Sequence, residues 1–380
     1  MSALSPNAVI DALRPVHDPE LNRSIVDLDM VRDVQVSDGV VSLTVTLTIA
    51  GCPLRNEIQQ RVNGAIRPLA GVKDVQLNFG VMTDEQRAAL REKLHGSPAA
   101  TAGSTPAQGH AQGRMIPFAQ PGSRTRPLLI SSGKGGVGKS SVTTNLAVAL
   151  AAAGHSVGVV DADIYGYSIP RMLGADRDPV VIDQMLIPPQ SYGVRCISIG
   201  YFVPDGQAVV WRGPMLHKAL EQFLTDVFWD EPDFLLIDMP PGTGDIALSL
   251  SQYLPRAEVY VVTTPQEAAQ KVARLSAAMA KKVNMSVRGV IENMSWFTGD
   301  DGKRYELFGS GGGKALADEL GVPLLAQIPL VNQLREGGDE GKPIAAIAPD
   351  SEVGRVFADL ATQIVAMRPK KVFSQALKVN

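Results

Sequence analysis

The sequence predicts an α/β protein, in which a mostly parallel sheet flanked by helices is preceded by a small α/β domain. First, short apolar runs alternate with helical patterns over the last two thirds of the chain, an order typical of parallel sheets. Second, residues 96–126 are rich in Gly, Ala, Ser, Thr, Pro and Gln and contain no Asp or Glu. Third, 45% hydrophobic and 20% charged residues in a chain of 380 are enough to build ordinary cores. A chain of this length suggests about two to three domains.

The polar stretch divides the chain into parts of normal domain size. We expect a small α/β domain over residues 1–95 and a flexible linker over residues 96–126. The larger domain is expected over residues 127–368, followed by a C-terminal tail over residues 369–380.

The small domain carries its own α/β pattern. Apolar residues alternate with Ser and Thr over residues 41–49, which predicts a half-buried strand. Cys52 and Pro53 follow, and then a helical pattern runs to about Ile66, with Pro53 suited to the first helical position. A second alternation over residues 75–81 predicts another strand.

The larger domain is expected to be a series of buried strands joined by helices, for example over residues 141–153 and 266–282. In such sheets ligands bind at the carboxyl ends of the strands. The expected strands are residues 128–130, 157–160, 234–237, 259–262, 287–291 and 324–328.

Residues 133–140 read Gly-Lys-Gly-Gly-Val-Gly-Lys-Ser, between an expected strand and an expected helix. In that context the glycines open backbone conformations closed to residues with a Cβ, so that N–H groups turn inward and form an anion site. The N-terminal end of the following helix adds positive potential. We expect Lys139 to bind the outer phosphates and Ser140 to ligate Mg²⁺. The alternative is a glycine-rich turn that binds nothing. The expected nucleotide-binding residues of this loop are Gly133, Gly135, Gly136, Val137, Gly138, Lys139, Ser140 and Ser141.

Acidic residues follow two of the expected strands. Asp161 and Asp163 come directly after the strand at 157–160, and Asp238 comes directly after the strand at 234–237. A carboxylate at such a strand end is where Mg²⁺ coordination is needed, and we expect Asp238 to fill that role, through a water molecule. Asp163 is the candidate that positions or activates the attacking water. The alternative is that these acids cap loops and face solvent.

The sequence after Asp238 reads Met-Pro-Pro-Gly-Thr-Gly-Asp. Gly242 and Gly244 are expected to let the backbone approach the terminal phosphate.

Together these motifs resemble the deviant Walker A ATPases of the MinD and ParA superfamily. The resemblance implies an ATP-dependent homodimer in which the first lysine of the loop, Lys134, reaches the phosphates of the partner subunit. It also implies that Lys139 and Asp163 act in ATP hydrolysis and that Asp238 is the switch aspartate. ATP and Mg²⁺ are the implied cofactors.

Several motifs are more narrowly similar to the Mrp/ApbC type of iron–sulfur cluster carrier. They are Val-Asp-Ala-Asp-Ile-Tyr-Gly at 160–166, Ile-Glu-Asn-Met-Ser at 291–295 and Phe-Gly-Ser-Gly-Gly-Gly at 308–313. Asn293 matches the adenine-contacting asparagine of that family. Asp-Pro-Glu-Leu at 18–21 and Thr-Ile-Ala-Gly-Cys-Pro at 48–53 resemble the small iron–sulfur assembly domain often fused in front of such ATPases.

One part of the family pattern is missing. Carriers of this type have Cys-x-x-Cys shortly after Glu-Asn-Met-Ser, whereas residues 296–308 contain no cysteine. The only thiols are Cys52 and Cys196, and thiolate is the usual cluster ligand. Cys52, expected at a helix start where thiolate is favoured, is the candidate for a cluster or thiol contact, the alternative being a small residue packed at a turn. Cys196, in a strand-like run over residues 194–199, is expected to be inert and buried.

The leading interpretation is therefore an ATP-hydrolysing homodimer that assembles iron–sulfur clusters or transfers them to apoproteins. One alternative is a positioning or regulatory switch of the MinD or ParA kind, and another is an ATP-binding scaffold with negligible turnover. A net charge of −3 gives no support for a nucleic-acid partner. No apolar run approaches the roughly 20 residues that a membrane helix needs, and the tail at 369–380 is short for an amphipathic anchor, so we expect no stable membrane attachment. The start of the chain lacks the features of a signal peptide, so we expect a cytoplasmic protein.

Overall fold

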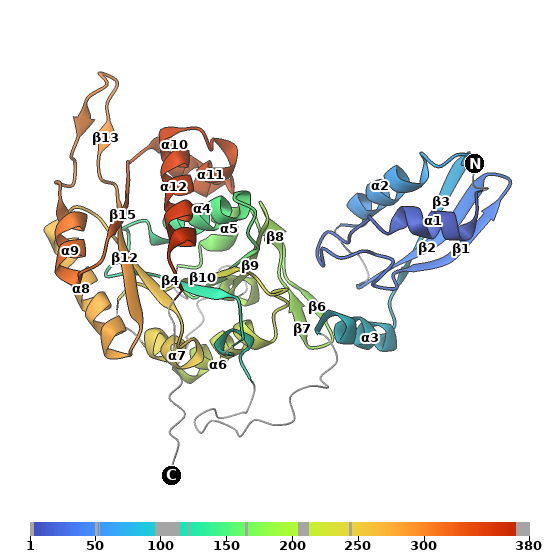
Figure 1. Cartoon of the computed structure of the whole chain (residues 1–380), viewed down its shortest axis with the longest axis horizontal. Helices are drawn as coiled ribbons and strands as arrows, with labels where there is room; N and C mark the ends of the chain where they lie inside the picture. Colours follow the sequence, from blue (N-terminus) through green and yellow to red (C-terminus); the bar gives the residue numbers. More distant parts are fainter. Residues whose placement is uncertain are drawn as a thin grey trace, which may run out of the picture. The chain divides into compact units, whose positions relative to one another are not determined.

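The computed structural model describes residues 4–49, 52, 54–95, 115–120, 122–163, 166–203, 213–242 and 245–369. Most of the expected linker and nearly all of the expected tail lie outside these residues. The chain forms two compact units, each of which is described by itself (Figure 1). The first lies within Met1–Ala111 and also includes Val180–Ile187. The second lies within Gln112–Pro179 and Pro188–Asn380.

The first unit is a small α/β structure, as predicted. Its strand β2 is antiparallel to β1 and parallel to β3, because helix α2 provides the crossover between β2 and β3. The alternation expected over residues 41–49 is confirmed, since Val41, Leu43 and Val45 of β2 are all buried. The elements are α1 (Pro6–Leu13), β1 (Val31–Ser37), β2 (Val40–Leu47), α2 (Arg55–Ile66), β3 (Asp74–Val81) and α3 (Asp84–His95).

A two-stranded hairpin, β6 (Val180–Ile182) and β7 (Met185–Ile187), belongs to this first unit, although its residues fall within the range expected for the larger domain. Arg91 of α3 makes an ion pair with Asp183 at the turn of the hairpin, with Nη1 and Oδ2 2.5 Å apart. The pattern of apolar residues along the sequence does not predict that this hairpin belongs to the first unit.

The second unit is built on an eight-stranded sheet in the order β15-β12-β11-β4-β10-β5-β9-β8. Every neighbouring pair is parallel except β8 with β9. The predicted mostly parallel sheet is therefore confirmed. The first and last residues of each expected strand differ by at most two positions from those of an observed strand. The strands are β4 (Arg126–Ser132), β5 (Val157–Asp161), β8 (Gln190–Ser191), β9 (Val194–Ser198), β10 (Phe234–Asp238), β11 (Glu258–Thr263), β12 (Ser286–Asn293) and β15 (Leu324–Ile328).

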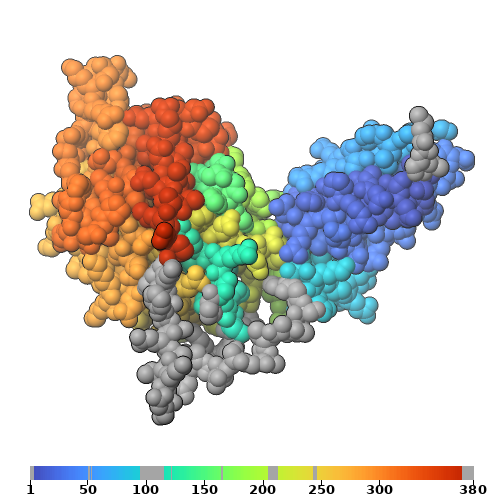
Figure 2. Space-filling view, viewed as in Figure 1, coloured from blue at the N-terminus to red at the C-terminus, as the bar shows by residue number. Residues whose placement is uncertain are grey.

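Helices flank this sheet. Helix α4 packs against the central strands on one side and against α11 and α12 on the other, which explains why residues 142–150 of α4 are all buried. Figure 2 shows the C-terminal residues in red beside the green residues of the α4 region, although they are far apart in the sequence. The helices are α4 (Lys139–Ala152), α5 (Ile169–Leu173), α6 (Gly213–Thr225), α7 (Asp245–Tyr253), α8 (Glu267–Lys282), α9 (Gly312–Leu320), α10 (Asn332–Glu340), α11 (Ile344–Ile347) and α12 (Glu352–Ala366).

The strand order explains why distant motifs meet. Strand β10 lies between β4 and β5, and the register places Asp238 beside both Ile130 and Asp161. The glycine-rich loop leaves β4 just beyond this level. The carboxyl ends of three neighbouring strands therefore present the loop and both groups of acids at one edge of the sheet. Within the described residues, no helix is long and apolar enough to cross a membrane.

Packing of α12 is expected to contribute strongly to stability. Leu360 is fully buried in the core that α12 shares with α4, whereas Leu275 on α8 is 59% exposed. Leu360→Ala should lower the free energy of unfolding by about 2–5 kcal/mol, because it removes buried methyl groups and leaves a cavity. The matched change Leu275→Ala should cost less than about 0.5 kcal/mol. Urea denaturation followed by circular dichroism measures both, and equal losses would contradict the packing described.

Candidate functional site

The glycine-rich loop joins β4 to α4, and its glycines serve two different purposes. Gly136 and Gly138 have φ of 79° and 80°, the left-handed region that favours glycine, and Gly138 is the N-cap of α4. Gly133 is needed for close packing, since a Cβ there would lie 2.3 Å from the carbonyl carbon of Val272 on α8. Gly135 has neither constraint, because a Cβ there would meet nothing within 4 Å. The expectation that all four glycines adopt conformations closed to other residues is thus wrong for two of them.

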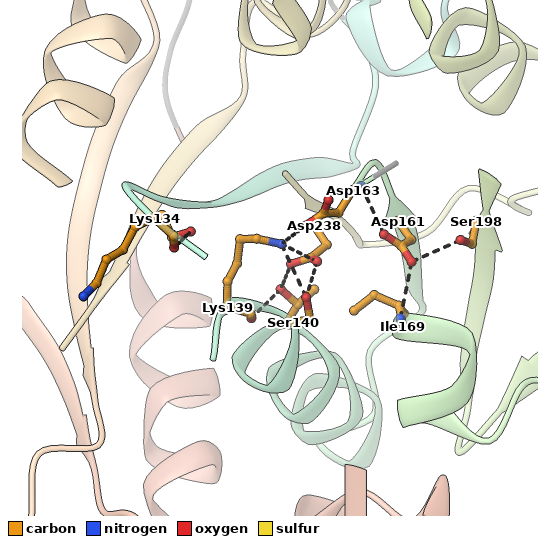
Figure 3. A network of polar contacts seen from close by, with 10 residues as sticks. Lys134, Lys139, Ser140, Asp161, Asp163, Ile169, Ser198 and Asp238 are labelled. Atoms are coloured by element: carbon orange, nitrogen blue, oxygen red, sulfur yellow. Dashed lines mark hydrogen bonds and ion pairs between the residues drawn. The ribbon is translucent and has the colours of Figure 1, made fainter. Parts of the chain in front are cut away.

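Lys139 is held by a buried carboxylate. Its Nζ lies 2.5 Å from Oδ2 of Asp238, which is fully buried at the end of β10 (Figure 3). Ser140 donates its hydroxyl to the same oxygen at 2.6 Å. The structure therefore brings together the predicted phosphate lysine, the predicted Mg²⁺ ligand and the predicted switch aspartate.

Asp163 faces the same lysine from the carboxyl end of the neighbouring strand β5. Its Oδ2 lies 3.6 Å from Nζ of Lys139, and the residue is 9% exposed. One ammonium group thus lies near two carboxylates. Such a group is ready to exchange a carboxylate partner for a phosphate, since both are anions that accept hydrogen bonds from lysine.

Thr143 is part of the site, and the sequence analysis did not identify it. Its Oγ1 lies 2.6 Å from Oδ1 of Asp238 and 3.0 Å from the carbonyl oxygen of Lys139. The hydroxyl has one proton, and the shorter distance and the charge of the acceptor favour Asp238. Helical spacing offered a signal, because a residue four positions after Lys139 lies on the same face of α4.

Asp161 is fully buried and does not face solvent, contrary to the alternative considered from sequence. Its carboxylate accepts hydrogen bonds from the backbone of Asp163 and Ile169 and from the hydroxyl of Ser198 (Figure 3). Burial, together with the negative charge of Asp238, raises the pKa of the Asp161 carboxyl above its ordinary value. The hydrogen bonds from Asp163 and Ser198 and the charge of Lys139 act in the opposite direction and lower this pKa.

Lys134 points away from the Lys139 cluster (Figure 3). Its Nζ donates to Oε1 of Gln266, the N-cap residue of α8, at 3.2 Å. Among the described contacts, Lys134 makes none with Asp163 or Asp238. Gln266 is a second residue that the sequence analysis did not connect with the site.

Asn293, at the end of β12, is packed against the glycine-rich loop. Its Nδ2 donates to the carbonyl oxygen of Val137 at 2.9 Å, and a Cβ on Gly138 would lie 2.2 Å from that nitrogen. Among the described atoms, Oδ1 of Asn293 is buried without a hydrogen-bond partner. A buried unsatisfied acceptor of this kind fits a donor from a ligand, such as the amino group of adenine.

The remaining predicted residues lie close by. Ser141 is in the first turn of α4, and its carbonyl oxygen accepts from Asn145. Gly242 has a φ of 95° and donates its N–H to the carbonyl oxygen of Ser132, so the segment after Asp238 is tied to the start of the glycine-rich loop. Gly244 lies outside the described residues.

The two cysteines lie in different units, and both are buried. Cys196 is fully buried in β9, and burial raises the pKa of its thiol, as expected for an inert side chain. Cys52 lies three residues before α2, which begins at Arg55, so the expectation that this thiol starts the helix is wrong. The helix dipole falls off within the first turn and therefore favours a Cys52 thiolate less than predicted. No group of three or more His, Cys, Asp or Glu able to hold a metal ion occurs in the described part of the chain.

The segment that lacks the family's cysteine pair forms a short hairpin, β13 (Phe297–Thr298) with β14 (Arg304–Tyr305), which projects from the second unit (Figure 1). The guanidinium group of Arg304 lies 4.3 Å from the ring centroid of Trp296, and the same group makes an ion pair with Glu352 at 3.2 Å. Aromatic and charged contacts thus stabilise the base of this hairpin.

Comparisons with known proteins agree with this geometry. Residues 124–365 match the family described as NUBPL iron-transfer P-loop NTPase, and residues 6–79 match the family described as iron-sulfur cluster assembly protein. The protein named iron-sulfur cluster carrier protein in Mycobacterium leprae is 48% identical over 362 residues, which are 93% of this chain and 91% of that protein. The protein of the same name in Synechocystis is 40% identical over 369 residues, which are 95% and 97% of the two chains.

A solved structure supports the fold of the second unit. The nucleotide-binding protein from Archaeoglobus fulgidus, in complex with ADP and with cobalt, is 35% identical with a TM-score of 0.51. The match covers 58% of this chain and 88% of that one. With a glycine-rich loop, a lysine paired with the buried Asp238 and these relatives, the chain belongs to the iron-transfer P-loop NTPases that are named iron–sulfur cluster carrier proteins.

Proposed function

We propose that this protein is an ATP-hydrolysing homodimer that acts in the assembly of iron–sulfur clusters or in their transfer to apoproteins. The observation that carries the proposal is the cluster of Lys139, Ser140 and Asp238 behind the glycine-rich loop. The matched family is one of P-loop NTPases, and the relatives are named as carriers of iron–sulfur clusters. Hydrolysis, the dimer and the cytoplasmic location belong to the proposal.

The oxygen atoms at the base of the site fit Mg²⁺. The hydroxyl of Ser140 and the carboxylate of Asp238 are hard oxygen ligands, the kind that Mg²⁺ prefers. When bound, the metal would neutralise charge on the phosphates. Lys139 would exchange Asp238 for the outer phosphates, which frees the carboxylate to face the metal, directly or through a water molecule.

Asp163 is proposed to position and activate the attacking water. Its Oδ2 lies 3.6 Å from Nζ of Lys139, and its side chain remains 13% exposed, which gives the access to solvent that a residue handling water requires.

Lys134 is proposed to act across the dimer. Its ammonium is directed away from its own phosphate lysine and is held by only one described hydrogen bond, to Gln266. The acceptor is a neutral amide oxygen, which binds an ammonium less strongly than an anion does, so a phosphate of the partner subunit can compete for the lysine. Asn293 would read adenine through its unsatisfied oxygen, which favours ATP over GTP.

The cargo is proposed to be an iron–sulfur cluster, handled without the Cys-x-x-Cys pair of the family. Cys52, in the unit that matches the iron–sulfur assembly family, is the proposed contact with cluster or thiol. Apoproteins that receive clusters would be the clients. No nucleic acid and no stable membrane attachment are part of this function.

The two lysines of the loop should fail in different ways. Lys139→Ala should abolish ATP binding, because nothing replaces its charge against the phosphates. Lys134→Ala should keep most binding in one subunit but lose turnover. Phosphate release and binding of a fluorescent ATP analogue measure these effects, with the exposed Lys282→Ala as the control that changes neither. Full turnover in Lys134→Ala would rule out the role across the dimer.

Thr143 and Thr144 are neighbouring buried threonines that provide a matched pair. Thr143→Val removes the donor to Asp238, so the Mg²⁺ concentration for half-maximal ATP binding should rise several-fold. Thr144 makes no hydrogen bond through Oγ1 within the described structure, so Thr144→Val should change this concentration less than twofold. Titration of Mg²⁺ at fixed ATP measures both, and equal shifts would contradict the role of Thr143.

Cluster binding can be tested by anaerobic reconstitution with iron and sulfide, followed by visible absorbance and iron content. The parent protein should bind cluster, Cys52→Ala should bind much less, and Cys196→Ala should match the parent because its thiol is fully buried. Equal binding by the parent and Cys52→Ala would exclude Cys52 as a ligand. Failure of all three to bind would argue against direct carriage.

A further inference from the structure

We propose that Asp161 is a positioning residue for ATP hydrolysis, which ties the backbone at Asp163 to strand β9 and so fixes where the Asp163 carboxylate lies. This inference rests on the proposed function, since it assumes that Asp163 handles the attacking water. Asp161 is fully buried, so it acts through other groups.

Both carboxylate oxygens of Asp161 are directed to protein donors. Oδ1 accepts from the backbone N–H of Asp163 at 3.1 Å. Oδ2 accepts from the backbone N–H of Ile169 at 3.3 Å and from the hydroxyl of Ser198 at 3.1 Å. One side chain therefore joins the start and the end of the segment that carries Asp163 (Figure 3).

Ser198 connects this segment to the sheet. The register of β5 and β9 pairs Asp161 with Ser198, so the two side chains lie side by side at the ends of neighbouring strands. The Ser198 hydroxyl also accepts from the backbone N–H of Gly200 at 3.0 Å. Asp161 and Ser198 thus connect the backbone of Asp163 to two strands of the sheet, β5 and β9.

The same carboxylate accepts a hydrogen bond from the N-terminal end of α5. Ser168 is the N-cap residue of this helix, yet its side chain makes no capping hydrogen bond. The N–H of Ile169, the first helical residue, donates to Asp161 instead. Asp161 therefore also fixes the first residue of α5.

A structural role alone does not explain this choice of residue. A fully buried carboxylate is costly to desolvate, and its neighbour Asp238 carries a like charge. Apolar residues of similar volume often stabilise a fold at least as well as buried charges. The cost of burying Asp161 is understandable if this residue orders the backbone beside a catalytic carboxylate. A displacement of about 1 Å at a reacting group can lower the rate about 100-fold.

Asp161→Asn tests the inference. The amide keeps the shape but presents an NH₂ group to a donor, so one of the three hydrogen bonds becomes repulsive. Turnover should fall about 10- to 100-fold, while the affinity for a fluorescent ATP analogue stays within about twofold. Hydrogen–deuterium exchange of the nucleotide-free protein should speed up at the amides of Asp163 and Ile169. Ser198→Ala should give a smaller effect in the same direction.

A double-mutant comparison separates positioning from a general loss of structure. Asp161→Asn combined with Asp163→Asn should turn over ATP no more slowly than Asp163→Asn alone, because the first change acts through the second residue. Asp233→Asn is the matched control, since Asp233 accepts the N–H of Ser156 at the other end of the β5 region. This control should alter neither turnover nor exchange at Asp163.

The possible failures are distinguishable. If Asp163→Asn hydrolyses ATP as fast as the parent, the proposed function of Asp163 fails and the inference fails with it. If Asp163→Asn is inactive but Asp161→Asn keeps full turnover, only the inference is overturned. It is also overturned if the two losses multiply in the double variant, or if Asp161→Asn loses nucleotide affinity as strongly as turnover.

Discussion

The ion pair between Lys139 and Asp238 is the interaction on which the rest of the site depends. Both groups are buried, at 6% and 0% exposure, and each is the nearest opposite charge to the other, so removal of either one would leave a poorly compensated charge in the interior. Ser140 and Thr143 supply further donors to the same carboxylate. The loop is thus held in shape by this carboxylate. In the function we propose, nucleotide binding exchanges the carboxylate for a phosphate as the partner of Lys139.

The sheet topology makes this exchange possible. Strand β10 lies between β4 and β5, which places Asp238 next to the glycine-rich loop on one side and next to Asp161 on the other. Helix α4 then carries Lys139, Ser140 and Thr143 on its first turns, and its apolar body is buried between the sheet and α12. The buried core therefore fixes the backbone that carries these polar side chains.

Local sequence patterns predicted the features that depend on neighbouring residues, namely the strands and the glycine-rich loop. Apolar runs gave the strands at 157–160 and 324–328 nearly to the residue, and the spacing of glycine and lysine gave the phosphate loop. Contacts between distant segments were not predictable in this way. Gln266 binds Lys134 across 132 positions, and Ser198 binds Asp161 across 37. The packing reason for Gly133, against α8, and the start of α2 beyond Cys52 also depend on tertiary structure.

The most direct test of this account is a crystal structure of the protein with Mg²⁺ and a non-hydrolysable ATP analogue. The account predicts that Nζ of Lys139 leaves Asp238, now 2.5 Å away, and contacts the outer phosphates, while Asp238 turns to the metal or its water. A structure in which nucleotide is bound but the Lys139–Asp238 ion pair is unchanged would contradict it.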